Sequence, residues 1–196
     1  MFKSYNFNAK ENDPQNYYYF DKGFNSDELS KIENNVVNLD FTDGSVDGSD
    51  LKENIRKSRI KWIPQNNDWE WLYSKLANMI TQANDDLWRF NITQIPEQIQ
   101  YTEYWADVKG KYDWHQDIGL GEASKRKISV TVQLSDTSDY EGGDLEMWKG
   151  SDNFVTANRG KGNVFIFPSY MVHRVKPVTK GIRKSFVLWV GGHHYI

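Results

Sequence analysis

The 196-residue sequence has no cysteine and only four histidines. Without cysteine the chain can form no disulfide, bind no metal through a thiolate and use no cysteine nucleophile. Protein ligands for a transition metal must therefore come from His, Asp or Glu. This makes the histidines the first residues to examine.

Long apolar runs and a strong excess of one charge are also missing. No stretch has the length that crosses a bilayer, and residues 1–15 lack the basic segment and apolar core of a secretory signal. The net charge of −3 and the pI near 5.8 give no overall basic field for nucleic acid. The sequence predicts a soluble, cytoplasmic protein with neither nucleic acid nor a membrane as its partner.

The length fits a single domain, residues 1–196, with a sizeable core. Two helices are expected in the first half, one beginning at Ser26 as N-cap and one opening at Asn67, with Glu70 completing a capping box. Their apolar positions have helical spacing: Leu29, Ile32, Val36 and Leu39, then Leu72, Leu76, Met79, Ala83 and Leu87. Between them, Asp40–Asp50 lacks the alternating acidic ligands of a calcium loop and is predicted to be a mobile loop.

From Ile99 onward the apolar period becomes two, and Gly-containing turns separate short runs rich in β-formers. The runs are Ile99–Tyr104, Lys127–Leu134, Asp144–Trp148, Asn163–Phe167 and Arg183–Val190. This pattern predicts a mainly β (α+β) fold, a jelly roll braced by N-terminal helices. Residues 1–95 would form the helical support region and residues 96–196 the catalytic core.

His115 and Asp117 lie two residues apart in an extended segment, so strand alternation places both side chains on one face, with Trp114 and Gln116 facing away. His173 follows the apolar run that ends at Phe167, where a second strand could bring a third ligand. Two imidazoles and a carboxylate suit iron(II) and leave three adjacent coordination positions open. The sequence thus predicts a metal site, and the catalytic centre, at His115, Asp117 and His173.

An open metal face is what oxygenase chemistry requires, because a keto acid can occupy two positions and dioxygen the third. The far carboxylate of such a keto acid needs a partner. Arg183 can bind it through two hydrogen bonds, assisted by the Ser185 hydroxyl on the same strand face.

Taken singly, these features have ordinary explanations. A His-x-Asp pair often arises by chance, a lone His173 is more often a hydrogen-bonded residue than a ligand, and a strand arginine is usually solvated. Their order along the chain favours a site: His-x-Asp, a Gly-Gly turn, Phe-Pro-Ser before the second histidine, then Arg-x-Ser on the last strand.

The chain resembles the prolyl 4-hydroxylase-like branch of the iron(II)/2-oxoglutarate dioxygenases, close to the PKHD-type hydroxylases, over roughly residues 99–191. The residues that carry the resemblance are Tyr104, Tyr112-Asp113-Trp114-His115-Gln116-Asp117, Tyr140-Glu141-Gly142-Gly143-Asp144-Leu145, Phe167-Pro168-Ser169, His173-Arg174-Val175-Lys176-Pro177-Val178-Thr179 and Gly181-Ile182-Arg183-Lys184-Ser185. It implies a double-stranded β-helix with His115, Asp117 and His173 as iron ligands. It further implies that Arg183 holds the distal carboxylate of 2-oxoglutarate and that Tyr104 reaches its keto-acid end.

The implied activity uses Fe(II), 2-oxoglutarate and O2, with ascorbate as a candidate reductant, and hydroxylates an unactivated C–H bond with release of succinate and CO2. The expected substrate is a prolyl residue in a peptide or protein. A free amino acid or small metabolite is the alternative substrate, and a jelly-roll binding module without turnover is the alternative function.

The sequence departs from the family pattern on the run Lys127–Leu134, where relatives often supply a tyrosine and this chain offers Thr131 or Gln133. Residues 1–95 carry little family signature. Most of the tryptophans Trp105, Trp114, Trp148 and Trp189 are expected to pack in the core, although Trp189 matches a position behind the co-substrate. His193 and His194 are expected to lie on the tail.

Overall fold

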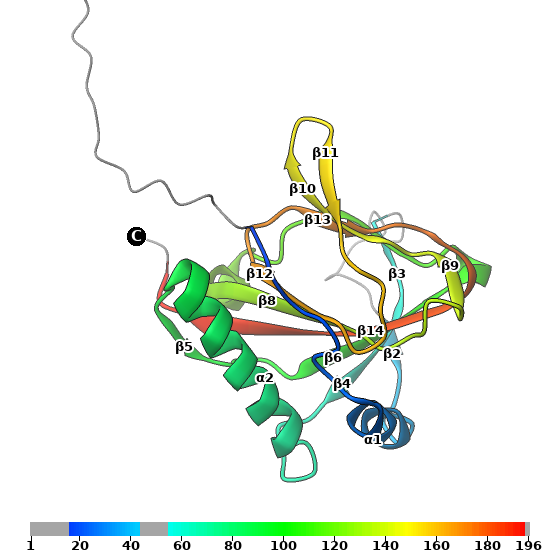
Figure 1. Ribbon diagram of the computed structural model, residues 1–196, viewed down its shortest axis with the longest axis horizontal. Helices are drawn as coiled ribbons and strands as arrows, with labels where there is room; N and C mark the ends of the chain where they lie inside the picture. The colour runs from blue at the N-terminus through cyan, green and yellow to red at the C-terminus, as the bar shows by residue number, and fades with distance from the viewer. Residues whose placement is uncertain (1–15, 44–54, 195–196) are drawn as a thin grey trace, which may run out of the picture.

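Two antiparallel sheets face each other in the computed structural model, which describes residues 16–43 and 55–194 (Figure 1). The larger sheet has the order β1 (Tyr18–Phe20), β12 (Val164–Pro168), β8 (Arg126–Gln133), β14 (Val178–Gly192), β6 (Ile99–Trp105), β4 (Arg59–Ile63) and β2 (Thr42–Asp43). Strands β5 (Ile92–Gln94) and β9 (Tyr140–Gly142) also pair with β14. The smaller sheet runs β11 (Asn153–Thr156), β10 (Leu145–Gly150), β13 (His173–Val175), β7 (Lys111–His115) and β3 (Arg56–Lys57).

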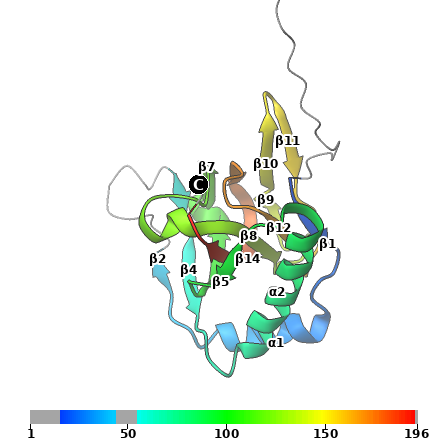
Figure 2. The same cartoon turned by 90° about the vertical axis from the view of Figure 1, so that its left-hand side faces the viewer.

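Two helices, α1 (Ser26–Val36) and α2 (Glu70–Ala83), cover the outer face of the larger sheet (Figure 2). A π-helical segment, η2 (Asn84–Trp88), continues α2, and 3-10 turns form η3 (Ala106–Val108) and η4 (Gly121–Lys125). The mainly β, jelly-roll fold predicted from the sequence is thereby confirmed.

Strand alternation divides the side chains of the larger sheet between two environments. In β8, Ile128, Val130 and Val132 join the core beneath the helices. Burying each such aliphatic side chain contributes about 1.5–3 kcal/mol, so the apolar positions fix which face of the strand meets the helices. The residues between them, including Ser129 and Thr131, consequently face the space between the two sheets.

The predicted helix starts were wrong by one to three residues. Asn25, not Ser26, caps α1: its side chain accepts a hydrogen bond from the Glu28 N–H, and the Glu28 carboxylate accepts one from the Asn25 N–H. Helix α2 begins at Glu70 rather than at Asn67, and Trp69 precedes it without a side-chain cap. Glu70 thus starts the helix and completes no capping box.

The first 95 residues contribute strands as well as helices. Strand β4 pairs with β6, β1 with β12, and β5 with β14, so this region extends the larger sheet. Strand β3 extends the smaller sheet beside β7. Of the predicted loop Asp40–Asp50, Thr42 and Asp43 form β2, and residues 44–50 lie outside the described residues.

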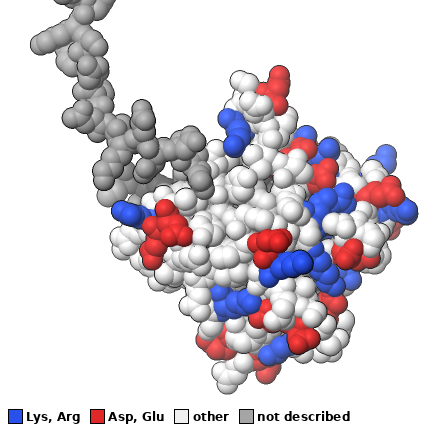
Figure 3. All heavy atoms as spheres, in the orientation of Figure 1, with Lys and Arg blue, Asp and Glu red and all other residues white. Residues whose placement is uncertain are grey.

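The surface has charges of both signs, mixed over the face seen in Figure 3. Among residues 16–43 and 55–194, no helix has both the length and the apolarity that a bilayer span demands. The hairpin β10–β11 projects beyond the rest of the smaller sheet (Figure 1).

Candidate metal centre

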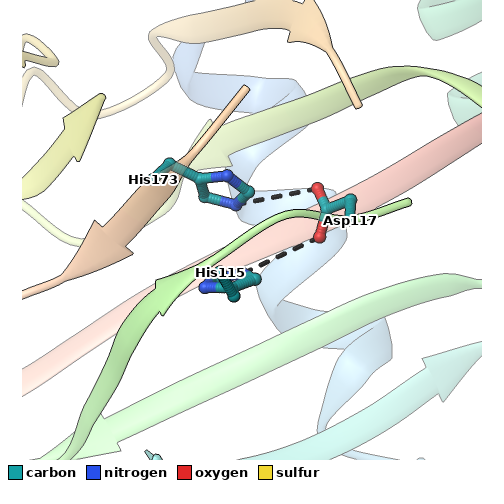
Figure 4. Close-up of side chains that lie close together, drawn as sticks. All are labelled: His115, Asp117 and His173. Atoms are coloured by element: carbon teal, nitrogen blue, oxygen red, sulfur yellow. Dashed lines mark ion pairs between the residues drawn. The ribbon is translucent and has the colours of Figure 1, made fainter. Parts of the chain in front are cut away.

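His115, Asp117 and His173 converge between the two sheets (Figure 4). His115 ends β7 and His173 begins β13, and the two are register partners in the smaller sheet. Nε2 of His115 lies 3.8 Å from one carboxylate oxygen of Asp117, and Nε2 of His173 lies 3.7 Å from the other. The structure therefore brings together all three residues that the sequence pattern singled out.

Each histidine is oriented by the carbonyl two residues before it. Nδ1 of His115 donates to the Asp113 carbonyl at 2.7 Å, and Nδ1 of His173 donates to the Met171 carbonyl at 2.8 Å. Because a carbonyl oxygen only accepts, Nδ1 must carry the hydrogen, and Nε2 keeps a free lone pair. Metal-binding histidines are commonly held in this way.

Asp117 lies just after β7. Hydrogen bonds with residues of β8 and of the segment after β12 hold its side chain and backbone in place. The Ser129 hydroxyl donates to its carboxylate at 2.6 Å, and Ser129 and Ser169 share a hydrogen bond of 3.0 Å. The backbone N–H of Asp117 donates to the Ser169 carbonyl at 3.0 Å, and Arg126 donates to the Asp117 carbonyl. Neither serine was among the site residues predicted from the sequence, because their role depends on pairing between strands distant along the chain.

The protonation states favour cation binding. Burial and, after it, the neighbouring His173 lower the pKa of His115 to about 3, which leaves its imidazole neutral at neutral pH. Burial alone would raise the pKa of Asp117, but His173, His115 and the Ser129 hydroxyl outweigh it and hold that pKa below its ordinary value. Neutral imidazole and ionised carboxylate are the forms that coordinate a metal.

The distances between the three candidate ligand atoms also suit a single metal ion. The three candidate ligand atoms lie within 4.8 Å of one another. Metal bonds of about 2.0–2.2 Å place adjacent donors about 3 Å apart and opposite donors about 4 Å apart, so small side-chain shifts close the site on one ion. Two nitrogens and one carboxylate match the facial arrangement of non-haem iron(II) oxygenases.

The three residues line a cavity of about 290 Å³ between the sheets. From β14, Arg183 and Ser185 line the same cavity; both are buried, and Nη1 of Arg183 donates to the Ser185 hydroxyl at 3.1 Å. Nε of Arg183 is buried without a hydrogen-bond partner among the described residues, and no carboxylate there forms an ion pair with this guanidinium. A buried cation with an open donor suits an anionic ligand.

Tyr104 lies beside this arginine, with the Arg183 guanidinium 5.5 Å from its ring centroid. The Gly-Gly turn packs closely against Arg183. A Cβ on Gly143 would lie 3.0 Å from Cδ of Arg183 and 2.9 Å from Cγ2 of Val178. Gly143 also has a φ of +64°, a conformation that favours glycine. The turn thus leaves room for the stem of Arg183.

The remaining residues singled out in the sequence lie in or near the cavity or on the surface. Thr131 and Trp189 do so from the larger sheet, whereas Gln133 is buried with its Oε1 unpartnered among the described residues. Gln116, which follows β7, borders the cavity and is exposed, and its side-chain amide donates to the Tyr170 carbonyl. Core packing was the wrong expectation for Trp148, which is exposed.

On the opposite face of the smaller sheet, Trp114 stacks with Phe154 at 5.3 Å. His193 and His194 are exposed and lie outside the group of candidate metal ligands found among the described residues.

Comparison with known proteins agrees with this geometry. Residues 99–191 match the model of the 2OG-Fe(II) oxygenase superfamily. A PKHD-type hydroxylase of Picosynechococcus is 38% identical over 169 residues, which cover 83% of this chain and 72% of that protein. A PKHD-type hydroxylase of Idiomarina loihiensis is 39% identical over 79 residues, covering 40% of this chain but only 36% of that protein.

The fold is shared with a prolyl hydroxylase from Trichoplax adhaerens, solved in complex with a peptide fragment of the hypoxia inducible factor oxygen degradation domain. The two structures superpose with a TM-score of 0.74 at 19% identity, over 90% of this chain and 83% of that one. Members of the matched superfamily use Fe(II), 2-oxoglutarate and O2. The long match to the Picosynechococcus protein, the superfamily match and the His-Asp-His cluster establish that this chain belongs to the 2OG-Fe(II) oxygenase superfamily, in its PKHD-type hydroxylase branch.

Proposed function

We propose that this chain is an iron(II)- and 2-oxoglutarate-dependent dioxygenase that hydroxylates an unactivated C–H bond of a prolyl residue in a peptide or protein. The observation that carries the proposal is one cavity lined both by the His115, Asp117 and His173 donors and by the buried Arg183–Ser185 pair. The family and the peptide-bound prolyl hydroxylase of similar fold support the choice of substrate.

When bound, iron(II) and 2-oxoglutarate supply the oxidising chemistry: one oxygen atom of O2 enters the substrate as a hydroxyl group and the other enters succinate, with loss of CO2. Nε2 of His115, Nε2 of His173 and the Asp117 carboxylate would hold the iron. The protein also fixes the tautomer of each imidazole through the backbone carbonyls described above.

The co-substrate would be bound through its distal carboxylate by the fork of Arg183, with the Ser185 hydroxyl as an additional donor. Tyr104 would contact its keto-acid end. Trp189, Val187 and Phe167 line the same cavity and would keep water from the reacting atoms. In this scheme no side chain acts as a general base, so the contributions of the chain are ligand geometry, anion binding and exclusion of water.

The test separates co-substrate binding from turnover. Anaerobic protein is mixed with iron(II) and 2-oxoglutarate, and the visible charge-transfer band of the chelate is measured. Oxygen is then admitted in the presence of proline-containing peptides, and succinate and the gain of one oxygen atom by each peptide are quantified by mass spectrometry.

The proposal predicts that the charge-transfer band forms and that succinate is produced in proportion to the hydroxylated peptide. Absence of the band would refute the co-substrate assignment. A band with hydroxylation of free amino acids but of no peptide would refute the peptidyl substrate. A band without succinate for any compound would favour a binding module.

A further inference from the structure

A second arginine, Arg56, lines the same cavity on the side of the smaller sheet. Its Nε donates to the Ser58 hydroxyl at 2.8 Å, and its Nη1 lies 3.5 Å from Oε1 of Gln100, at the limit of a hydrogen bond. Its Nη2 is buried and has no hydrogen-bond partner within residues 16–43 and 55–194. One edge of this guanidinium is therefore left with an unused donor.

Stacked rings connect Arg56 to the candidate metal centre. Arg56 is the register partner of Tyr112 across β3 and β7, and its guanidinium lies 4.9 Å from the Tyr112 ring centroid. The Tyr112 ring in turn stacks on His115, with centroids 3.4 Å apart and planes at 12°. A single aromatic ring thus separates the Arg56 cation from a metal ligand, which places Arg56 beside the reaction centre.

The other charges of the cavity are compensated. Arg126 forms an ion pair with Glu97, with Nη2 2.5 Å and Nε 2.7 Å from its two carboxylate oxygens. In the proposed reactant complex, iron(II), ionised Asp117, dianionic 2-oxoglutarate and Arg183 sum to neutrality. Arg56 remains as a cation without a carboxylate partner among the described residues. Arg56 is partly buried and its Nη2 is fully buried, so a ligand that pairs with this donor would offset the cost of its desolvation.

We propose that Arg56 binds a carboxylate of the substrate, so that the substrate of this enzyme carries an anionic group close to the C–H bond that is hydroxylated. This inference rests on the proposed function and specifies its substrate class. The carboxylate has two possible sources: the side chain of an aspartate or glutamate next to a prolyl residue, or the α-carboxylate of a prolyl residue at the C-terminus of a peptide. The guanidinium fork recognises both in the same way.

Binding is tested without turnover. The full-length protein is loaded with zinc(II), which takes the same ligand types without redox chemistry, and with 2-oxoglutarate, whose affinity is measured first by calorimetry. Matched probe pairs are then titrated. One pair is N-acetyl-L-proline and N-acetyl-L-prolinamide; the others are blocked peptides in which aspartate or asparagine precedes or follows proline.

Each pair is measured with the unmodified protein and with Arg56→Gln, Arg56→Lys and Lys57→Gln. Lys57→Gln is the matched control, since it removes a positive charge from the adjacent, exposed position of β3. Thermal midpoints report whether each variant folds.

We expect the carboxylate member of at least one pair to bind about 10- to 100-fold more tightly than its amide, the range of a charge-assisted hydrogen bond. This preference should disappear in Arg56→Gln, persist in weaker form in Arg56→Lys and remain in Lys57→Gln. The pair that shows it identifies the source of the carboxylate.

Three outcomes would overturn the role of Arg56. They are equal affinities within every pair, absence of binding by all carboxylate probes, and a preference for carboxylate that survives in Arg56→Gln. Failure of 2-oxoglutarate itself to bind would instead overturn the proposed function, and the inference with it.

Discussion

His115 and His173 are direct register partners across β7 and β13, and their ring centroids lie 4.1 Å apart. Both rings donate Nδ1–H to a carbonyl two residues earlier, so both present Nε2 toward Asp117. The two imidazoles are thus fixed by backbone pairing before any metal binds. The third donor, Asp117, lies beyond the end of the strand and depends on other contacts.

Replacing Asp117 with alanine should remove the only carboxylate of the candidate centre. Loss of hydrogen-bonded partners of metal ligands alone costs about 10- to 100-fold in affinity, so loss of a ligand should cost at least about 100-fold. Iron(II) affinity and the charge-transfer band with 2-oxoglutarate are the measurements. Asp113→Asn, at an exposed carboxylate of β7, should keep both. An unchanged band in Asp117→Ala contradicts the assignment.

Ser129 orients Asp117, and Ser129→Ala should therefore weaken metal binding about 10- to 100-fold while the chain still folds. As Ser129 touches no metal, its effect should appear in metal affinity and not in 2-oxoglutarate affinity once the metal is saturating. Ser124→Ala, at a hydroxyl in the exposed segment η4, serves as the control. Equal metal affinities of Ser129→Ala and the unmodified protein would show that Asp117 is held without this hydroxyl.

Arg183→Ala should chiefly weaken 2-oxoglutarate binding, by on the order of 100-fold, because truncating one partner of a buried charge pair costs about 2–5 kcal/mol. Arg183→Lys should recover only part of this affinity, since an ammonium cannot form the two parallel hydrogen bonds of a guanidinium. Two measurements serve as controls. One is the metal affinity of Arg183→Ala without co-substrate, and the other is the 2-oxoglutarate affinity of the neighbouring Lys184→Ala variant. A metal affinity that falls as far as the 2-oxoglutarate affinity would indicate general damage to the site.

Gly143→Ala tests whether the Gly-Gly turn makes room for Arg183. The added Cβ would meet the Arg183 stem and the Val178 side chain, so 2-oxoglutarate affinity should fall together with the thermal midpoint. Gly150 also has positive φ, at +102°, but a Cβ there meets nothing within 4 Å. Gly150→Ala should consequently lower the thermal midpoint alone, and the same loss of affinity in both variants would exclude a specific effect on Arg183.

Glu28 stabilises the fold as part of the cap of α1 and as partner of Lys75 at 2.7 Å. Burial raises the pKa of Glu28, but hydrogen bonds from Lys75 and from the Asn25 N–H outweigh it and lower that pKa below 4.5. A lowered folded-state pKa means that the stabilisation is present above the ordinary value and is lost as the pH falls through the folded value.

Glu28→Gln should therefore reduce the free energy of unfolding by about 1 kcal/mol near pH 7, and this difference should shrink in acid. Chemical unfolding at several pH values measures it, with Glu33→Gln, a partly exposed residue of the same helix that pairs with Lys161 and takes no part in the cap, as the control. A difference that stays constant into acid would show that the carboxylate charge is not its cause.

The sequence pattern was informative wherever periodicity decides the structure. All five predicted strands exist, with ends shifted by a few residues, because alternating apolar positions fix one buried face. The order of His115, Asp117, His173 and Arg183 predicted which side chains meet. Helix starts were less predictable, since several polar residues near each start can serve as the cap.

Residues that depend on distant strand pairing gave no local signal. Ser129 lies in a run that reads as an ordinary buried strand, and its contact with Asp117 arises only when β8 and the segment after β7 meet. Arg56 lies in the part of the chain with little family signature, residues 1–95, and its place in the cavity wall depends on the pairing of β3 with β7.

Strand β14 pairs with β6 on one side and with β8 on the other from Ser185 onward, and Arg183, paired with Tyr104 of β6, lies two residues before this doubly paired stretch. Strand β3, which carries Arg56, has two residues and pairs with β7 alone in the described part of the chain. Backbone amides from Ser185 onward in β14 should therefore exchange with deuterium only when the whole domain unfolds, whereas those of β3 should exchange through local opening. In the proposed scheme, the common co-substrate is thus bound beside the slowest-exchanging part of the molecule, and the individual substrate is bound by a part that can open on its own.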